Sequence, residues 1–185
     1  MAIESELAAP QLLIAVPHLG DANFRRTVVL VLDHGDQGTM GLTINRPGSL
    51  PMGAFCAGQS MPFAGDPQKR VFQGGPVQTD RAFILHASEH QGPETEVVFD
   101  SVRLSYSLES LRIIAQAPPA RFRVYLGYAG WAPRQLAAEV HAGAWLVVSP
   151  SEELVLGTEA GEIWDRALAR EGIAAVQLVP SSGLH

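Results

Sequence analysis

Residues 27–45 read TVVLVLDHGDQGTMGLTIN, and this stretch decides the fold that we expect. Two apolar runs rich in β-branched residues flank a connection rich in Gly and Asp, a pattern typical of a β-hairpin. In the second run the residues from Met40 to Ile44 alternate between apolar and small or polar types. This alternation places Asn45 on the less apolar face, at the end of the strand.

Further apolar runs on both sides of the hairpin predict additional strands, and apolar residues at helical spacing predict helices later in the chain. Hairpins first and strand–helix alternation later indicate a mixed α+β domain. Residues 48–70 are rich in Gly and Pro without a sustained period, so we expect a long loop there, after a loose N-terminus at 1–10. The predicted strands cover 12–16, 27–33, 39–45, 71–73, 81–86, 96–100, 104–107, 122–131, 144–148 and 174–179, and the predicted helices cover 107–117, 133–144 and 158–172.

The composition predicts one globular domain and contains few basic residues. The chain has 185 residues, of which 46% are apolar and 17% charged, so it can bury a core. Its net charge is -6 and its pI is about 5.4. The adjacent basic pairs are Arg25-Arg26 and Lys69-Arg70, which do not form the basic stripe that nucleic-acid binders use to neutralise phosphates. The charge therefore argues against direct nucleic-acid binding.

The single cysteine and the N-terminal residues predict a cytoplasmic protein. Cys56 excludes an internal disulfide, which fits a reducing compartment. Glu4 and Glu6 stand where a signal peptide would carry positive charge. The longest apolar runs, such as VVLVL at 28–32, are far shorter than a membrane-spanning helix requires. We expect no membrane association.

The sequence HASEH at 86–90 matches the H-x-x-E-H pattern of inverted zinc proteases. That chemistry needs both histidines on one face of a helix, so that both reach one zinc ion. His86, however, ends a strand-like run, and the following QGP would limit any helix to about one turn. Cys56 has no adjacent basic group to lower its pKa. We therefore expect no metal site, no cofactor and no identifiable catalytic residue.

Two strand ends carry the best candidate for a ligand site. INRP (44–47) and QGGP (73–76) each follow a predicted strand. If they are neighbours, the guanidinium of Arg46 and the backbone N–H groups of Gly74 and Gly75 could bind a small anion. The alternative is that the glycines only turn the chain and that Asn45 caps loose backbone groups. An enzyme at this corner would need a titratable group, such as His86, within hydrogen-bond reach.

Three blocks of the chain resemble the AlgH/YqgE family of bacterial proteins: PHLGDANFRRTVVLVLDHGDQGTMGLTINRP, FQGGPVQTDRAFILH and YLGYAGWAPRQLAAEVHAGAWL. The resemblance runs from about residue 10 to the C-terminus. It implies a single α+β domain with a bent, partly barrel-like, mixed or antiparallel sheet flanked by helices. Members are generally uncharacterised, and the name AlgH reflects a proposed link to the regulation of alginate synthesis. No established catalytic residues come with the resemblance, whose motif positions include Phe24, Asn45, Arg46, Gly74, Gly75, His86, Trp131, Gln135, Glu139 and Trp145.

Three hypotheses for function follow. The first is a non-enzymatic binding or regulatory protein of the cytosol, acting through an unknown protein or a small anionic ligand, with any effect on transcription being indirect. The second is an enzyme acting on a small anionic substrate at the ligand-binding candidates Asn45, Arg46, Gly74, Gly75 and His86. The third is an assembly partner, which would expose a contiguous apolar patch involving Trp131, Trp145 or residues 48–70.

Overall fold

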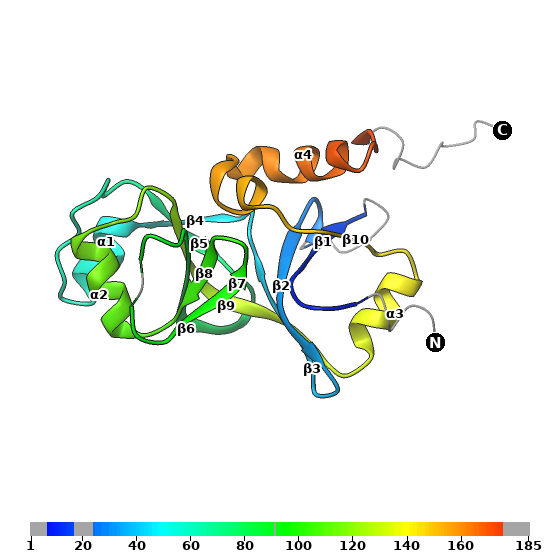
Figure 1. Cartoon of the computed structure of the whole chain (residues 1–185), viewed down its shortest axis with the longest axis horizontal. Helices are drawn as coiled ribbons and strands as arrows, with labels where there is room; N and C mark the ends of the chain where they lie inside the picture. Colours follow the sequence, from blue (N-terminus) through cyan, green and yellow to red (C-terminus); the bar gives the residue numbers. More distant parts are fainter. Residues whose placement is uncertain (1–6, 17–23, 91, 176–185) are drawn as a thin grey trace.

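The computed structural model describes residues 7–16, 24–90 and 92–175. Within these ranges ten strands form one curled, half-barrel sheet, and helices pack around it in a single α+β domain (Figure 1). This confirms the predicted fold class. The strands are β1 (Gln11–Ala15), β2 (Val28–Gly35), β3 (Gly38–Thr43), β4 (Pro47–Pro51), β5 (Arg70–Gln73), β6 (Val77–His86), β7 (Thr95–Phe99), β8 (Val102–Ser105), β9 (Phe122–Trp131) and β10 (Trp145–Val148). The helices are α1 (Met52–Gly58), α2 (Leu108–Gln116), α3 (Gln135–His141) and α4 (Ile163–Arg170), with the π-helical turn η2 (Glu153–Gly157) and the 3-10 turn η3 (Ala160–Glu162) before α4.

The strand β9 connects the two halves of the sheet, whose order is β10-β1-β2-β3-β9-β6-β8-β7. Along one edge, the first half of β9 pairs in parallel with β5 and its second half pairs antiparallel with β3. Along the other edge, β9 pairs antiparallel with β6. Because β4 pairs with β5, the β4–β5 ribbon also depends on β9 for its place in the fold.

The apolar runs of β1 and β2 are continuous because both faces of these strands are buried. Leu12 and Leu30 face the cluster that α4 covers, whereas Leu13 and Val29 face the cluster that includes Leu136 of α3. The predicted hairpin between β2 and β3 is confirmed, with register pairs from 29–43 to 35–38. Sequence alone placed these strands correctly because each run is long and β-branched.

The predicted long loop over 48–70 is irregular only in its second part. The strand β4 and the helix α1 occupy residues 47–58, and only the following segment up to β5 is irregular. The helix buries Met52, Phe55 and Cys56 beneath α2, in a cluster that also contains Ile114. Three buried positions within seven residues are too few to produce a recognisable helical period.

The other predicted elements agree with the structure at their centres and differ at their ends. The helix α2 begins after Ser107, whose hydroxyl accepts from the backbone N–H of Ser110. The helices α3 and α4 are shorter than predicted, and turns precede both of them. In the predicted N-terminal tail, Leu7 is buried against the α3 side of the sheet. Residues 1–6 and most of the predicted strand at 174–179 lie outside the described residues.

The connection from β5 to β6 crosses over β9, and the backbone of Gly74 and Gly75 packs closely against the backbone of β9. The chain leaves β5 on one edge of β9 and begins β6 on the other edge, opposite Tyr128. A Cβ atom on Gly74 would lie 2.3 Å from the carbonyl oxygen of Gly127, and one on Gly75 would lie 2.1 Å from the carbonyl carbon of Tyr128. Real Cβ contacts are never that short, so only glycine fits at these two positions.

We predict that Gly74→Ala lowers the free energy of unfolding by about 1–3 kcal/mol, because the added methyl group meets rigid backbone of β9. Urea denaturation of the purified protein measures the change. The matched control is Gly58→Ala at the end of α1, where nothing lies within 4 Å of the new Cβ. That variant should be neutral or more stable, by up to about 1 kcal/mol. Equal stability of both variants would contradict the crossing constraint.

Candidate functional site

The two strand ends that the sequence singled out lie next to each other. The backbone N–H of Thr43 donates to the carbonyl oxygen of Gly74 (2.8 Å), and that of Gln73 donates to the carbonyl oxygen of Arg46 (2.8 Å). The segments 44–47 and 73–76 are therefore hydrogen-bonded neighbours. The two segments thus form one corner, as an anion site shared between them would require.

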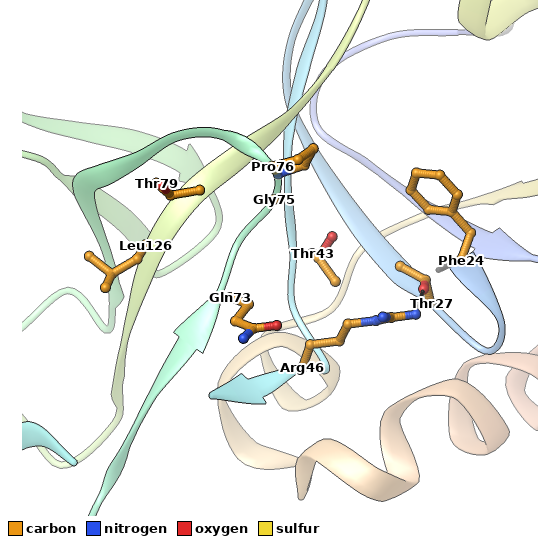
Figure 2. A pocket seen from close by; sticks show the side chains of 9 residues that line it. All are labelled: Phe24, Thr27, Thr43, Arg46, Gln73, Gly75, Pro76, Thr79 and Leu126. Atoms are coloured by element: carbon orange, nitrogen blue, oxygen red, sulfur yellow. Dashed lines mark hydrogen bonds between the residues drawn. The ribbon is translucent and has the colours of Figure 1, made fainter. Parts of the chain in front are cut away.

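An open cavity of about 700 Å³ lies at this corner (Figure 2). Its size is within the usual range of small-molecule sites. Its wall is formed by the turn before β2, by the ends of β3 and β5 with the connections that follow them, and by parts of β6 and β9. The described residues that line it are Phe24, Thr27, Thr43, Arg46, Gln73, Gly75, Pro76, Thr79 and Leu126.

Arg46 supplies the charge in this cavity, since no other charged side chain belongs to the described lining. Its Nη2 donates to the hydroxyl of Thr27 (2.7 Å) and to the carbonyl oxygen of Arg25 (3.3 Å). An arginine has five N–H donors, so these two bonds orient the guanidinium and leave further donors for a ligand. Thr43, Thr79 and Gln73 add neutral hydrogen-bonding groups.

Asn45 has a structural role in the corner. Its Oδ1 accepts from the backbone N–H of Val28 (3.0 Å), and its Nδ2 donates to the carbonyl oxygen of Arg26 (2.7 Å). The side chain thus ties the end of β3 to the turn before β2, which is the capping alternative that the sequence left open. Asn45 is not part of the described cavity lining.

The two glycines differ in what they offer the cavity. The backbone N–H of Gly74 donates to the carbonyl oxygen of Leu126 (2.8 Å) and is therefore committed to the sheet. Gly75 lines the cavity directly. A side chain at either position would collide with β9, so both glycines are needed for the chain crossing. Of the two backbone N–H groups that the sequence suggested for anion binding, only that of Gly75 remains a candidate.

His86 does not reach the cavity. It lies at the opposite end of β6, paired with Phe122 and Arg103 of the neighbouring strands, and it is completely buried. Its Nδ1–H donates to the carbonyl oxygen of Ala87 (2.9 Å), and its Nε2 accepts from the hydroxyl of Ser105 (2.9 Å). Burial lowers its pKa below the ordinary histidine value, which fits this neutral tautomer.

The histidines of the HASEH motif lie together, yet they form no metal centre within the described chain. The rings of His86 and His90 meet edge to face with centroids 4.9 Å apart. Among the described residues no group of three or more His, Cys, Asp and Glu side chains could hold a metal ion. Cys56 is buried, and burial raises the pKa of its thiol, so it has the character of a core residue.

A partly buried network, which sequence reasoning did not connect to the site, supports one wall of the cavity. The carboxylate of Glu139 accepts from the indole N–H groups of Trp131 (3.0 Å) and Trp145 (2.8 Å). The ring of Phe24 packs edge to face on Trp145, with centroids 5.8 Å apart. All four residues are among the motif positions of the AlgH/YqgE resemblance, and this was the signal in the sequence that could have indicated the network. Both tryptophans are buried, so they do not form the exposed patch of the assembly hypothesis.

Several known proteins are similar to this chain over nearly its whole length. The profile of a family described as AlgH-like matches residues 12–176. A UPF0301 protein of Myxococcus xanthus (strain DK1622) is 43% identical over 178 residues, which cover 96% of this chain and 98% of that protein. A UPF0301 protein of Sinorhizobium medicae (strain WSM419) is 37% identical, with 94% and 90% covered.

Two solved structures match the fold. The solution structure of the AlgH protein from Pseudomonas aeruginosa aligns with a TM-score of 0.75 at 34% identity, covering 97% of this chain and 99% of that one. The crystal structure of protein DIP2367 from Corynebacterium diphtheriae aligns with a TM-score of 0.76 at 18% identity, covering 93% and 91%. At that identity the second match supports the fold alone. Within the described residues, no helix has the length and apolar character needed to cross a membrane.

We predict that the protein loses stability as the pH falls from about 7 to 5. Burial lowers the pKa of both His86 and His90 in the folded state, so the unfolded chain binds more protons once the pH drops below about 6.5. The stabilisation is complete above that pH and is lost toward the folded-state pKa values. Each histidine can contribute up to about 1.4 kcal/mol per pH unit, measured by urea denaturation across the pH range.

The variant His90→Phe tests whether the buried histidines cause this pH dependence of stability. It removes one titrating group, and also a buried Nε2 that has no hydrogen-bond partner among the described residues. The slope of stability against pH should therefore become smaller. A wild-type protein whose stability does not change between pH 7 and 5 would show that these histidines do not titrate on unfolding.

Proposed function

The chain belongs to the AlgH-like family, and we propose that it is a non-enzymatic binding protein whose ligand is a small organic anion held at Arg46. The anion lies in the cavity between the turn before β2 and the β5–β6 connection. Its negative group pairs with the guanidinium of Arg46, and its apolar part contacts Phe24, Pro76 and Leu126. Ligand occupancy, transmitted to a protein partner, is the proposed means of regulation.

The proposal rests on one observation: the oriented guanidinium of Arg46 lies in a mostly apolar cavity, and no carboxylate is among the described residues that line it. Arg46 is held by Thr27 and by the backbone of Arg25, so it loses little conformational freedom when an anion binds. An arginine fork binds carboxylate or phosphate groups through two parallel hydrogen bonds. A cavity of this kind favours a monoanion that carries an apolar group.

Binding is favoured over catalysis because the enzyme alternative depended on His86. Proton transfer needs a titratable group within hydrogen-bond reach of the reacting atoms. His86 lies at the other end of β6, and the described lining contains no His, Cys, Asp or Glu. The chemistry available at the corner is therefore recognition of charge and shape. In a cytosolic protein with a net charge of -6, any effect on transcription would pass through this ligand or a protein partner and not through direct contact with DNA.

We expect Arg46→Ala to weaken binding of the anion roughly 10- to 100-fold, the usual loss for one charge-assisted hydrogen-bonded pair. Native mass spectrometry of freshly purified protein first reports whether a small molecule is retained. Isothermal titration with hexanoate and hexyl phosphate then measures affinity for the two anion types. The matched control is Arg25→Ala, which removes the same charge from an exposed neighbouring side chain outside the described lining.

A second variant separates a lost ligand contact from a lost fold. Thr79→Trp fills the cavity from the exposed start of β6 and leaves the hydrogen bonds of Arg46 intact. It should reduce binding while thermal unfolding stays close to wild type. Unchanged affinity in both Arg46→Ala and Thr79→Trp, or no affinity of the wild type for either probe and no retained adduct, would refute the proposal.

A further inference from the structure

A second cavity, of about 460 Å³, lies on the other face of the β4–β5 ribbon. Pro47 and Phe72 are paired across the ribbon and line this second cavity. Arg46, just before Pro47, and Gln73, just after Phe72, line the first cavity. Successive side chains of a strand point to opposite faces, which explains the division. The segment from Ala120 to Arg123 and the turns η2 and η3 complete the wall of this cavity, which we call the basic cleft.

The basic cleft concentrates positive charge in an acidic protein. Lys69, Arg70, Arg121 and Arg123 line it, and Glu159 is the one carboxylate in its described lining. The whole chain has only 13 basic residues against 19 acidic ones, and Lys69 is its only lysine. Four cations around one cavity are therefore a marked departure from the average surface.

Three of these cations lack a carboxylate partner. Within the described chain, Arg121 forms ion pairs with Glu152 (3.8 Å) and Glu153 (3.3 Å). Lys69, Arg70 and Arg123 take part in none of the ion pairs between described residues. Uncompensated cations that repel one another are unfavourable unless an anion joins them.

Backbone carbonyl groups and aromatic rings hold the cations in place. Arg123 donates to the carbonyl oxygens of Val155 (2.8 Å) and Thr158, and Arg70 donates to that of Ser49 (2.5 Å). The ammonium of Lys69 lies 3.9 Å from the centroid of the Phe122 ring. Because each guanidinium has five N–H donors, the arginines keep donors beyond those used in these bonds. The cleft is thus built before a ligand arrives.

The electrostatic state of Lys69 agrees with this geometry. Burial lowers its pKa below the usual lysine value, and the neighbouring charge of Arg123 lowers it further, against a smaller opposing effect of Asp66. Both main causes disfavour the charged ammonium in the empty cleft. The negative charge of a bound anion would favour the ammonium and oppose the effect of Arg123, so the pKa of Lys69 should rise when an anion binds.

We infer that the basic cleft binds a diphosphate group through Lys69, Arg70, Arg121 and Arg123. A diphosphate carries about two to three negative charges at neutral pH, which suits the three cations that form no ion pair between described residues, beside Arg121, which is shared with Glu152 and Glu153. Arginine forks and a lysine point charge are the side chains that proteins use for phosphate groups. The cations Arg123 and Lys69 already cover the faces of Phe72 and Phe122, so recognition falls on the phosphates and not on a stacked base. Inorganic pyrophosphate and the diphosphate of a nucleotide are the two sources.

Isothermal titration of the full-length protein at low ionic strength with pyrophosphate, ADP, orthophosphate and AMP tests the inference. Pyrophosphate and ADP should bind at least about tenfold more tightly than orthophosphate and AMP, because the latter offer one phosphate. Lys69→Gln and Arg121→Gln should each weaken pyrophosphate binding roughly 10-fold or more. Arg112→Gln, an exposed arginine of α2 outside both cavities, should not change it.

The single lysine permits a direct readout at the site. Reductive methylation with ¹³C-formaldehyde labels Lys69 and the chain's amino terminus, and the Lys69 signal should titrate at higher pH when pyrophosphate is present. Arg46→Ala should retain pyrophosphate binding, because Arg46 lies outside the basic cleft. The experiment therefore tests the basic cleft separately from the organic-anion site at Arg46. ADP binding well above that of pyrophosphate supports a nucleotide source, and equal binding supports the inorganic one. Undetectable binding of both, equal affinity for orthophosphate, or full affinity in Lys69→Gln overturns the inference.

Discussion

Where the Gly74–Gly75 segment crosses β9, backbone packs directly on backbone, with no room for a Cβ atom between them. This contact lets one chain run up one edge of β9 as β5 and return along the other edge as β6 within a three-residue connection. The strand β9 then has three partners, and the sheet closes into a half-barrel around it. A larger residue at the crossing would push β5 from the edge of β9, and the β4–β5 ribbon would lose its anchor with it.

Both candidate sites follow from this placement. The β4–β5 ribbon branches from the sheet at β9, and residues on its two faces line two different cavities. On one face Arg46 is oriented by the turn before β2, and on the other face Phe72 lies beneath the guanidinium of Arg123. The stability of each site therefore depends on the crossing, although neither site uses Gly74 as a ligand.

The sequence was informative where an element carries its own pattern. The hairpin at 27–45 was predicted because two long β-branched runs flank turn residues, and α2 because its apolar residues recur over nearly three turns. The short helix α1 was missed because it buries only Met52, Phe55 and Cys56. Sequence reasoning named both halves of the Arg46 corner, but their contact depends on a crossing that no local pattern encodes. Sequence reasoning grouped His86 with this corner, but His86 lies at the far end of β6. Lys69 and Arg123 come close only through the pairing of β5 with β9.

The charge distribution would give the two proposed sites different selectivity. An overall negative protein repels small anions weakly at a distance, because salt screens charges beyond about 8 Å at physiological ionic strength. Inside a cavity the low dielectric strengthens local attraction, so a few cations outweigh the distant net charge. Arg46 alone suits one negative group with an apolar extension, whereas four cations in the basic cleft need several negative charges to balance them. Two cavities on opposite faces of one ribbon would thus select different anions by the number of charges, without competition between them.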